Sequence, residues 1–328
     1  MTCNWYIGRL WAIGIGKETT PWTAVAPTTW IPFETWEVKP VIETQKDTGA
    51  YGVIDETYDS RVVKNMSEIP LWGIVRNDFI WDILTGVLWI AEAPIDNGDG
   101  TYTHNFTRKN DNCPISYTSY YSNPVWDEEA TYCVFDNLDI ELNSGDYVKF
   151  NTTLKGKALA TPWTDRTPAF TDQKEFLVAN AEVKFADTIW DLDSATAVEL
   201  KNIKFTISKN VIDYQAIGST DVTSLHNQQF NVTWDLEALF KDVVLRDYVL
   251  TNSKKAMSIK VLSQDIIWTW SAKSELYFEF ARIGFNDWGK STDSNGLVMQ
   301  TMGFEAEFSA VDWKTISAKL VNEKSTQY

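Results

Sequence analysis

Residues 77–89 read NDFIWDILTGVLW, and residues 237–250 read EALFKDVVLRDYVL. In each stretch the apolar residues recur at i, i+1, i+4 and i+5, which is the spacing of one buried face of an amphipathic helix. The same positions return as apolar residues after 160 residues, except that Asp247 stands where Val87 would be matched. We therefore expect two helices whose buried cores are formed by Phe79, Ile80, Ile83, Leu84, Leu239, Phe240, Val243 and Val244.

Both stretches have flanking residues that are typical of helix ends. Asn77 and Asp235 precede them and can cap the first free backbone N–H groups. Gly86 and Asn252 stand near their ends and can stop them. These are the only two stretches with a convincing helical period.

The rest of the chain has the pattern of β-strands. The sequence contains 16 Trp, 16 Phe and 13 Tyr, and such aromatic enrichment suits pleated, half-buried sheets. Within the hairpin predicted over 131–157, Leu138 and Ile140 alternate with Asp139 and Glu141. A strict period of two predicts a sheet with one core face and one polar face.

The order of these elements occurs twice along the chain. A strand, a long loop, a second strand, a helix and further strands follow one another in each half, with long loops at 45–60 and 209–224. We therefore expect a mainly β fold of duplicated sandwich or barrel modules, each with one flanking helix. The predicted divisions are an N-terminal arm at 1–32, a first module at 33–159, a connector at 160–176 and a second module at 177–328.

Charge excludes several classes of partner. The formal net charge is −16 and the sequence pI is near 4.6. Attractive binding to nucleic acid or to an anionic membrane needs a basic surface, which this composition does not favour. No apolar run is long enough to span a bilayer, and we expect no signal peptide, because the run at 10–16 is short and interrupted by glycine.

Catalytic and metal-binding patterns are missing from the sequence. The cysteines are Cys3, Cys113 and Cys133, and the histidines are His104 and His226. They form no ligand pair, and the chain contains no HExxH, GxSxG or P-loop pattern. Paired carboxylates could serve a glycosidase, but nothing in the sequence predicts a cleft for them. We expect neither an enzyme nor a cofactor.

The aromatic excess leaves two functional hypotheses open. The first is that the aromatic residues fill cores and subunit interfaces of a self-assembling protein. The second is that they stack on sugar rings, as in a secreted β-sandwich module that binds polysaccharide. The missing signal peptide favours the first hypothesis.

A short N-terminal pattern resembles a known family. Gly16-Lys17-Glu18-Thr19-Thr20, then Thr23-Ala24, then Trp30-Ile31-Pro32 are similar to the N-terminal signature of tail tube proteins of long-tailed bacteriophages. Trp22 stands where that family usually has a glycine. The strand–loop–strand–helix run through 60–89 and the hairpin around Gly145 are similar as well.

The resemblance implies a virion structural protein whose β-sandwich subunits form rings and whose rings stack into a hollow tube. Two modules per chain would give a trimeric ring with pseudo-sixfold symmetry, and a hexameric ring is the alternative. The resemblance also implies assembly in the bacterial host cytoplasm and contacts with tape-measure and tail-end proteins. DNA would pass through the tube without specific binding, and the tube would have no membrane contact.

The resemblance assigns roles to two sets of residues. The long loops would contact the adjacent ring through Asp47, Tyr51, Ile54, Tyr58, Tyr214, Ile217 and Asp221. The polar sides of the inner strands would line the lumen through Glu37, Glu43, Asp139, Glu141, Asp235, Glu305 and Glu307. An acidic or neutral polar wall would let DNA slide, because it offers no counterion release.

Overall fold

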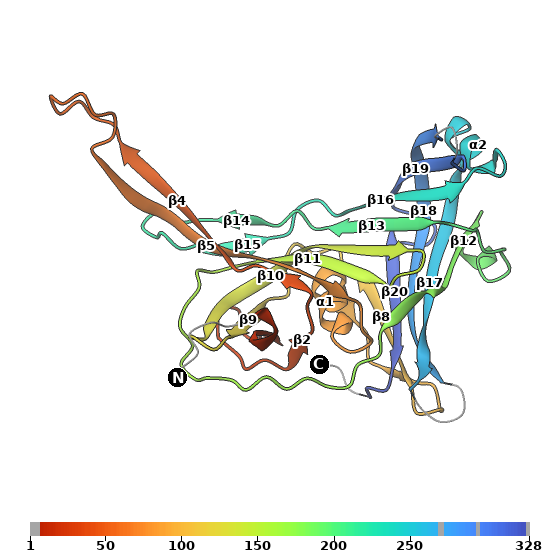
Figure 1. Cartoon of the computed structure of the whole chain (residues 1–328), viewed down its shortest axis with the longest axis horizontal. Coiled ribbons are helices and arrows are strands. Elements are labelled where there is room, and N and C mark those ends of the chain that lie inside the picture. The colour runs from red at the N-terminus through yellow and green to blue at the C-terminus, as the bar shows by residue number, and fades with distance from the viewer. Residues whose placement is uncertain (1–6, 268–271, 293–295, 326–328) are drawn as a thin grey trace.

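The structure is a computed structural model that describes residues 7–267, 272–292 and 296–325. The fold is mainly β, as the sequence predicts, and has two α-helices in the described residues. Neighbouring strands pair antiparallel, so most of the chain lies in large antiparallel sheets (Figure 1). None of the helices in these ranges is long and apolar enough to cross a membrane.

Eight strands form one continuous sheet that passes through both halves of the chain, and we call it the eight-stranded sheet. In spatial order these strands are β4 (Lys39–Asp47), β5 (Asp59–Ile74), β11 (Lys149–Gly156), β10 (Glu128–Asn143), β13 (Asn202–Ser208), β16 (Asn231–Leu239), β19 (Met299–Ala306) and β18 (Lys273–Ser291). The short β3 (Thr35–Trp36) pairs with β5 in line with β4.

Two smaller sheets branch from the long strands β10 and β18. The first half of β10 pairs with β9 (Tyr117–Ser122), which leads to β1 (Ala12–Lys17) and β2 (Thr29–Ile31). The first half of β18 lies between β17 (Lys254–Ile266), which leads to β12 (Phe176–Ala186), and β20 (Ile316–Asn322), which leads to β8 (Tyr102–Arg108). Strands β6 (Trp89–Ala91) and β7 (Ile95–Asp96) also pair with β8.

The remaining elements are short. They are the hairpin of β14 (Ile212–Tyr214) and β15 (Ser224–His226), and the 3-10 helices η1 (Gly8–Leu10) and η2 (Ile189–Asp191). Cys113 and Cys133 are free thiols, and Cys3 lies outside the described residues.

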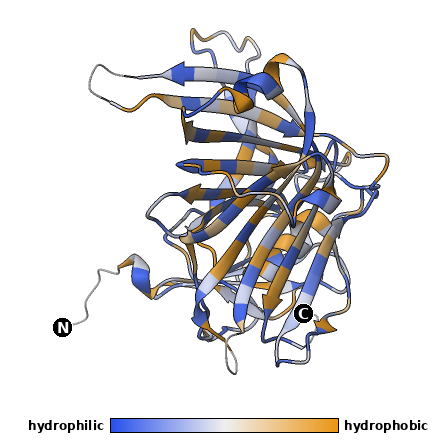
Figure 2. Cartoon of the chain, turned by 90° about the vertical axis from the view of Figure 1, so that its right-hand side faces the viewer, coloured by the Kyte–Doolittle hydropathy of each residue, from blue (hydrophilic) through white to orange (hydrophobic). Residues whose placement is uncertain are grey.

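The hairpin predicted over 131–157 is confirmed as β10 and β11. Leu138 and Ile140 are buried, and they point to the face opposite Asp139 and Glu141. The turn between the strands contains Gly145, whose φ of 87° lies in the left-handed region that favours glycine. Figure 2 shows the resulting alternation of hydrophobic and hydrophilic residues along the strands.

Helix α1 (Ile80–Leu88) lies in the centre of the main hydrophobic core. All nine of its residues are buried. Phe79 precedes it and packs against Phe150 of β11, with ring centroids 5.1 Å apart. Gly86 lies inside the helix and does not end it. Glycine is needed there because a Cβ would lie 2.2 Å from Phe135 Cδ2. The helix ends at Trp89, whose φ is 74°.

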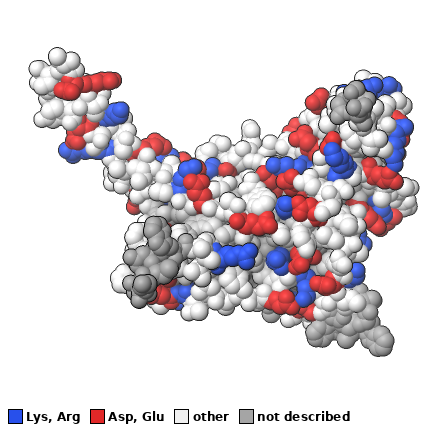
Figure 3. All heavy atoms as spheres, in the orientation of Figure 1, with Lys and Arg blue, Asp and Glu red and all other residues white. Residues whose placement is uncertain are grey.

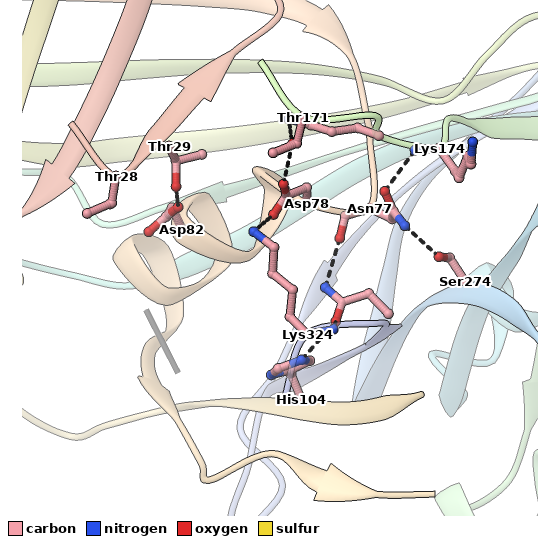
Figure 4. Close-up of polar contacts among 12 residues, drawn as sticks. Thr28, Thr29, Asn77, Asp78, Asp82, His104, Thr171, Lys174, Ser274 and Lys324 are labelled. Atoms are coloured by element: carbon pink, nitrogen blue, oxygen red, sulfur yellow. Dashed lines mark hydrogen bonds and ion pairs between the residues drawn. The ribbon is translucent and has the colours of Figure 1, made fainter. Parts of the chain in front are cut away.

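The segment before α1 connects the helix to distant parts of the chain (Figure 4). Asn77 does not cap the helix; its Nδ2 donates to Ser274 Oγ at 2.8 Å, and its Oδ1 accepts from Lys174 N–H at 2.8 Å. Its backbone carbonyl accepts from Asn322 Nδ2 at 3.0 Å, and His104 contacts Asn322 at 3.0 Å. These bonds fix the first helix against β18, β20 and the connector.

The second helix is shorter than the predicted 237–250. Helix α2 spans Val244–Leu250, whereas Glu237–Leu239 belong to β16. The hydrogen bonds to β13 and β19 on both sides hold these residues in a strand and override the helical propensity of the EALF segment. Asp235 is accordingly in mid-strand and caps nothing.

The core assignment for the second helix is therefore wrong. Leu239 ends β16 and Phe240 follows it, while Val243 and Val244 are exposed. Only Leu245 of α2 is buried. The two helices thus have unlike surroundings, since α1 is a core element and α2 lies at the surface against β18.

A buried lysine joins the second half of the chain to α1. Lys209 follows β13 and is fully buried, and its Nζ donates to the carbonyl oxygen of Gly86 at 2.7 Å. The ammonium also lies 5.3 Å from the centroid of the Trp89 ring. Burial lowers the pKa of Lys209 to about 7, and the nearby Asp136 carboxylate opposes this shift.

Asp82→Asn is expected to stabilise the protein at alkaline pH. Asp82 is buried on α1, where its carboxylate accepts from Thr29 Oγ1 at 2.6 Å, and burial raises its pKa from 3.8 to about 7. In the wild-type protein, the stability that the protonated Asp82 side chain contributes is fully present below its unfolded-state pKa of 3.8 and is lost as the pH rises through 7. At one pKa unit per about 1.4 kcal/mol, the cost at pH 8 is at most about 4 kcal/mol.

Chemical denaturation at pH 4 and pH 8 measures this effect. The asparagine keeps an oxygen for Thr29 but has no charge, so we expect a higher free energy of unfolding at pH 8 and nearly none of that gain at pH 4. A variant that is less stable than wild type at pH 8 would contradict the assignment.

Candidate assembly surfaces

The polar face of the eight-stranded sheet brings together acidic residues from both halves of the chain. The strand registers place Asp139 opposite Thr206, Thr206 opposite Thr233, and Thr233 opposite Glu305. The next row contains Glu141, Lys204, Asp235 and Gly303 in the same order. Directly opposed residues in antiparallel strands share a face, so Asp139, Glu141, Asp235 and Glu305 lie on one surface.

Glu37 belongs to the same face, whereas Glu43 and Glu307 lie away from it. The Glu37 N–H donates to Pro70 O at 3.2 Å, and Pro70 continues the row through Thr153 to Asn137. Glu43 is on the projecting part of β4, and Glu307 follows the end of β19.

Both of these carboxylates form ion pairs. Glu43 contacts Lys64 at 3.1 Å. Glu307 accepts from Lys254 and from Arg282 Nε, the latter at 2.9 Å, and the bond from Lys254 is the main cause that lowers the pKa of Glu307.

Basic side chains also lie on this face. Lys204 lies 3.6 Å from Asp139, which is only 9% exposed and also accepts from Asn137 and Asn151. Asp235 and Glu305 are exposed, so they carry more of the accessible charge than Asp139 does. Figure 3 shows that acidic and basic side chains are interspersed over the side of the molecule drawn there.

The first long loop is the tip of a projecting hairpin, which we call the arm (residues 39–68). Strands β4 and β5 extend beyond the body of the molecule (Figure 1). At the tip, Tyr51 and Tyr58 stack with centroids 4.0 Å apart. Asp47 accepts from Tyr51 Oη at 2.5 Å and from Gly49 N–H at 2.9 Å, and these bonds, the Tyr51 bond first, lower the pKa of Asp47.

The arm therefore has an ordered tip that exposes apolar surface. Ile54 is fully exposed, and Tyr51, Val53 and Tyr58 are exposed beside it. An exposed apolar cluster of this kind on a projecting element is typical of a protein–protein contact.

The second long loop is folded back onto the base of the arm. The Asn65 N–H donates to Thr220 O at 2.8 Å, Lys64 contacts Asp213 at 2.9 Å, and Asp221 bridges to Asn65. A separate apolar cluster fills the space between them, and it consists of Met66, Tyr132, Val134, Val211, Val222 and Leu225. At the outer end of this loop, Tyr214 and Ile217 remain exposed.

The two histidines have structural contacts. His104 is buried against Asn322, and His226 bonds to Ser224 at 2.8 Å. Within the described ranges, no cluster of three or more His, Cys, Asp and Glu could hold a metal ion. Among the large aromatic side chains, Trp81 and Trp234 are buried in the core, whereas Trp126, Trp163, Trp190 and Trp313 are exposed.

A family model described as phage tail tube protein matches residues 8–306, nearly the whole chain. The chain belongs to the phage tail tube protein family. A search of curated proteins finds no match. As a phage tail tube protein, the chain is a structural subunit of the virion tail that assembles with other subunits into a tube.

The sequence signals for this tail tube protein were incomplete in one respect. Lys204, the basic partner of Asp139 on the polar face, was not predicted. The alternation through 198–208 puts Lys204 on the polar side of its strand and could have found it.

Proposed function

We propose that the chain forms stacked rings whose polar, net-acidic sheet face lines a lumen through which the DNA genome passes during ejection. The eight-stranded sheet is the observation that carries this proposal. It has one buried face and one polar face, and it continues without a break from the first half of the chain to the second. A sheet of this kind can close with its neighbours around a hole.

We also propose that the chain consists of two equivalent modules, at 33–159 and 177–328. The order of strands supports this division. In the first half β4, β5, β11 and β10 are neighbours, and in the second half β13, β16, β19 and β18 are neighbours in the same order. The long strand of each half also pairs with the strand before it in the chain, β10 with β9 and β18 with β17.

Two modules per chain favour a ring of three chains with pseudo-sixfold symmetry, with a ring of six chains as the alternative. Closing the ring also removes strand edges that would otherwise promote aggregation. The arm would reach the adjacent ring with the exposed residues of its tip. Tape-measure and tail-end proteins would be partners of the tube, which would assemble in the host cytoplasm.

Electrostatics would keep the genome mobile. Duplex DNA carries about one negative charge per 1.7 Å, so a basic wall would bind it by counterion release. A wall of mixed but net-negative charge repels DNA weakly, and screening limits that repulsion to roughly 8 Å at physiological salt. DNA would therefore slide without binding.

Negative-stain microscopy of the purified, concentrated protein tests the proposal. Stacked rings or hollow filaments are the expected result. A monodisperse monomer at every concentration, with no rings, would overturn it.

Charge reversal of exposed residues on the polar face tests the lumen assignment. We expect Asp235→Lys with Glu305→Lys to leave tubes intact but to slow DNA ejection about 10-fold or more, since a basic wall gains counterion release. We do not choose Asp139, because it is buried and its reversal would disrupt the contact with Lys204.

The control carries the same change of charge away from the eight-stranded sheet, at the exposed residues Glu92 and Glu323. Ejection kinetics from particles that carry each variant are the readout. Equal rates for the two double variants would show that the polar face does not line the DNA path.

A further inference from the structure

Two edges of the eight-stranded sheet are open. Beyond Gly284, β18 pairs with β19 on one side and with no described strand on the other. Strands β3 and β4 pair with β5 on one side and with no described strand on the other. Apart from the buried Phe285, the side chains along both edges are exposed or half-buried. These edges offer unpaired backbone N–H and C=O groups to another chain.

The two halves of the chain already meet through one such junction. Strand β10 pairs with β13 with Leu138 opposite Ile207 and Glu141 opposite Lys204. Backbone bonds flank this ladder, from Ser144 N–H to Lys201 O at 3.0 Å and from Lys209 N–H to Asp136 O at 2.9 Å. Even-numbered residues of β10 are thus the hydrogen-bonded positions of the junction, and odd-numbered residues are the non-hydrogen-bonded ones.

A β-bulge aligns β18 with β10. The register between β10 and β11 shifts between Phe135 and Asn137, and the register between β18 and β19 shifts between Phe285 and Asp287. Bulges are specific local features rather than random irregularities. The two bulges match at an offset of 150 residues, so Glu141 corresponds to Ser291.

The neighbouring ladders align β3 and β4 with β13. Ile69 of β5 and Trp234 of β16 are opposite the matched residues Leu154 and Phe304. With the same offset along β5 and β16, Trp72 corresponds to Glu237. Trp72 is opposite Thr35, and Glu237 is opposite Asn202. Residues 35–41 therefore correspond to residues 202–208, and Glu37 corresponds to Lys204.

We propose that the open edge of β18 in one copy pairs antiparallel with the β3–β4 edge of the next copy, in the register of the β10–β13 junction. This register places Asp287 opposite Val41, Gly289 opposite Lys39, and Ser291 opposite Glu37. The inference rests on the proposed ring and specifies which strands close it.

Charge complementarity supports this register. Within the chain, Lys204 is diagonal to Asp139 across the β10–β13 junction, and the two side chains are in contact. Between copies, Lys39 would be diagonal to Asp287 in the same sense. Pro40 costs the β5 ladder nothing, but it has no N–H to donate on the open side of β4, so the proposed ladder has one hydrogen bond fewer than the β10–β13 junction.

Cysteine pairs test the register directly. Opposed residues at non-hydrogen-bonded positions have Cα atoms about 4.5 Å apart, which is within the range of a disulfide. The test variant is Glu37→Cys with Ser291→Cys, in a background with Cys3 and Cys113 changed to serine. The off-register control is Glu37→Cys with Asp287→Cys. Glu141→Cys with Lys204→Cys is the internal reference for the observed junction.

Mild oxidation followed by a non-reducing gel is the readout. We expect chains linked to one another for the test variant, few such links for the off-register control, and a link within one chain for the internal reference. Rings that assemble without links in the test variant, or with more links in the off-register control, would overturn the register. A background protein without rings would instead refute the proposed function.

A second pair of variants tests the same edge independently, in case the cysteine variant does not assemble. Lys290 corresponds to Ile140, so its N–H is on the open side of β18. Lys290→Pro is expected to keep the unfolding transition of the monomer and to lose rings, whereas Lys290→Ala keeps both. Normal rings from Lys290→Pro would overturn the proposal.

Discussion

Replacing residues 48–58 by a two-residue Asn-Gly turn is expected to abolish tubes and to leave single rings. Asp47 lies opposite Asp59 in the β4–β5 ladder, so a tight turn can join these two residues without a change of register. The deletion removes Tyr51, Ile54 and Tyr58, which form the exposed apolar tip of the arm. It leaves the eight-stranded sheet and the core untouched.

Size-exclusion chromatography with light scattering and negative-stain microscopy measure this outcome. A matched control is Tyr51→Phe, which keeps the stack with Tyr58 and removes only the hydroxyl that donates to Asp47. We expect the control to form tubes. Tubes of normal length from the deletion variant would contradict the role of the arm in contacts between rings.

Gly86→Val is expected to destabilise the fold by about 3 kcal/mol or more. A Cβ at this position would lie 2.2 Å from Phe135 Cδ2, and both residues are in a close-packed core that cannot move freely. The displaced helix would also lose the bond from Lys209 Nζ to Gly86 O. Because Lys209 belongs to the second half of the chain, we expect one cooperative loss of stability rather than a local one.

Chemical denaturation of the monomer measures the change. The control is Thr85→Val on the same helix, where the buried hydroxyl has no hydrogen-bond partner and the change of shape is small. We expect the control to stay within about 1 kcal/mol of wild type. A Gly86→Val protein of wild-type stability would show that α1 does not pack on Phe135 as described.

Much of the fold could be predicted from local patterns. The period of two in 131–157 predicted β10 and β11, because one face of that sheet is buried and the other is polar. This alternation also determines which side chains point to the core. The apolar stripe at 79–84 predicted α1 for the equivalent reason.

The second helix could not be placed in the same way. Residues 236–240 suit one turn of helix as well as the end of a strand, and only the neighbours β13 and β19 decide between them. Those neighbours are about 30 to 60 residues away in the sequence, so no local pattern contains this information. The equivalence of the two halves consequently rests on strand order and on the matched bulges, not on the helices.

The candidate sites were predicted unevenly. Alternation placed Asp139, Glu141, Asp235 and Glu305 on a common polar face, because strand parity is local. Which of them pair with lysines depends on register across strands, as for Asp139 and Lys204. The burial of Lys209 could not be predicted, since it depends on a helix more than a hundred residues away.

Native mass spectrometry of a single ring, isolated with the arm-tip deletion, tests the central proposal most directly. Two equivalent modules that join edge to edge predict a ring of three chains of 37.4 kDa each, with six similar lobes in end-on views. A ring of six chains, or an assembly without a central hole, would contradict it.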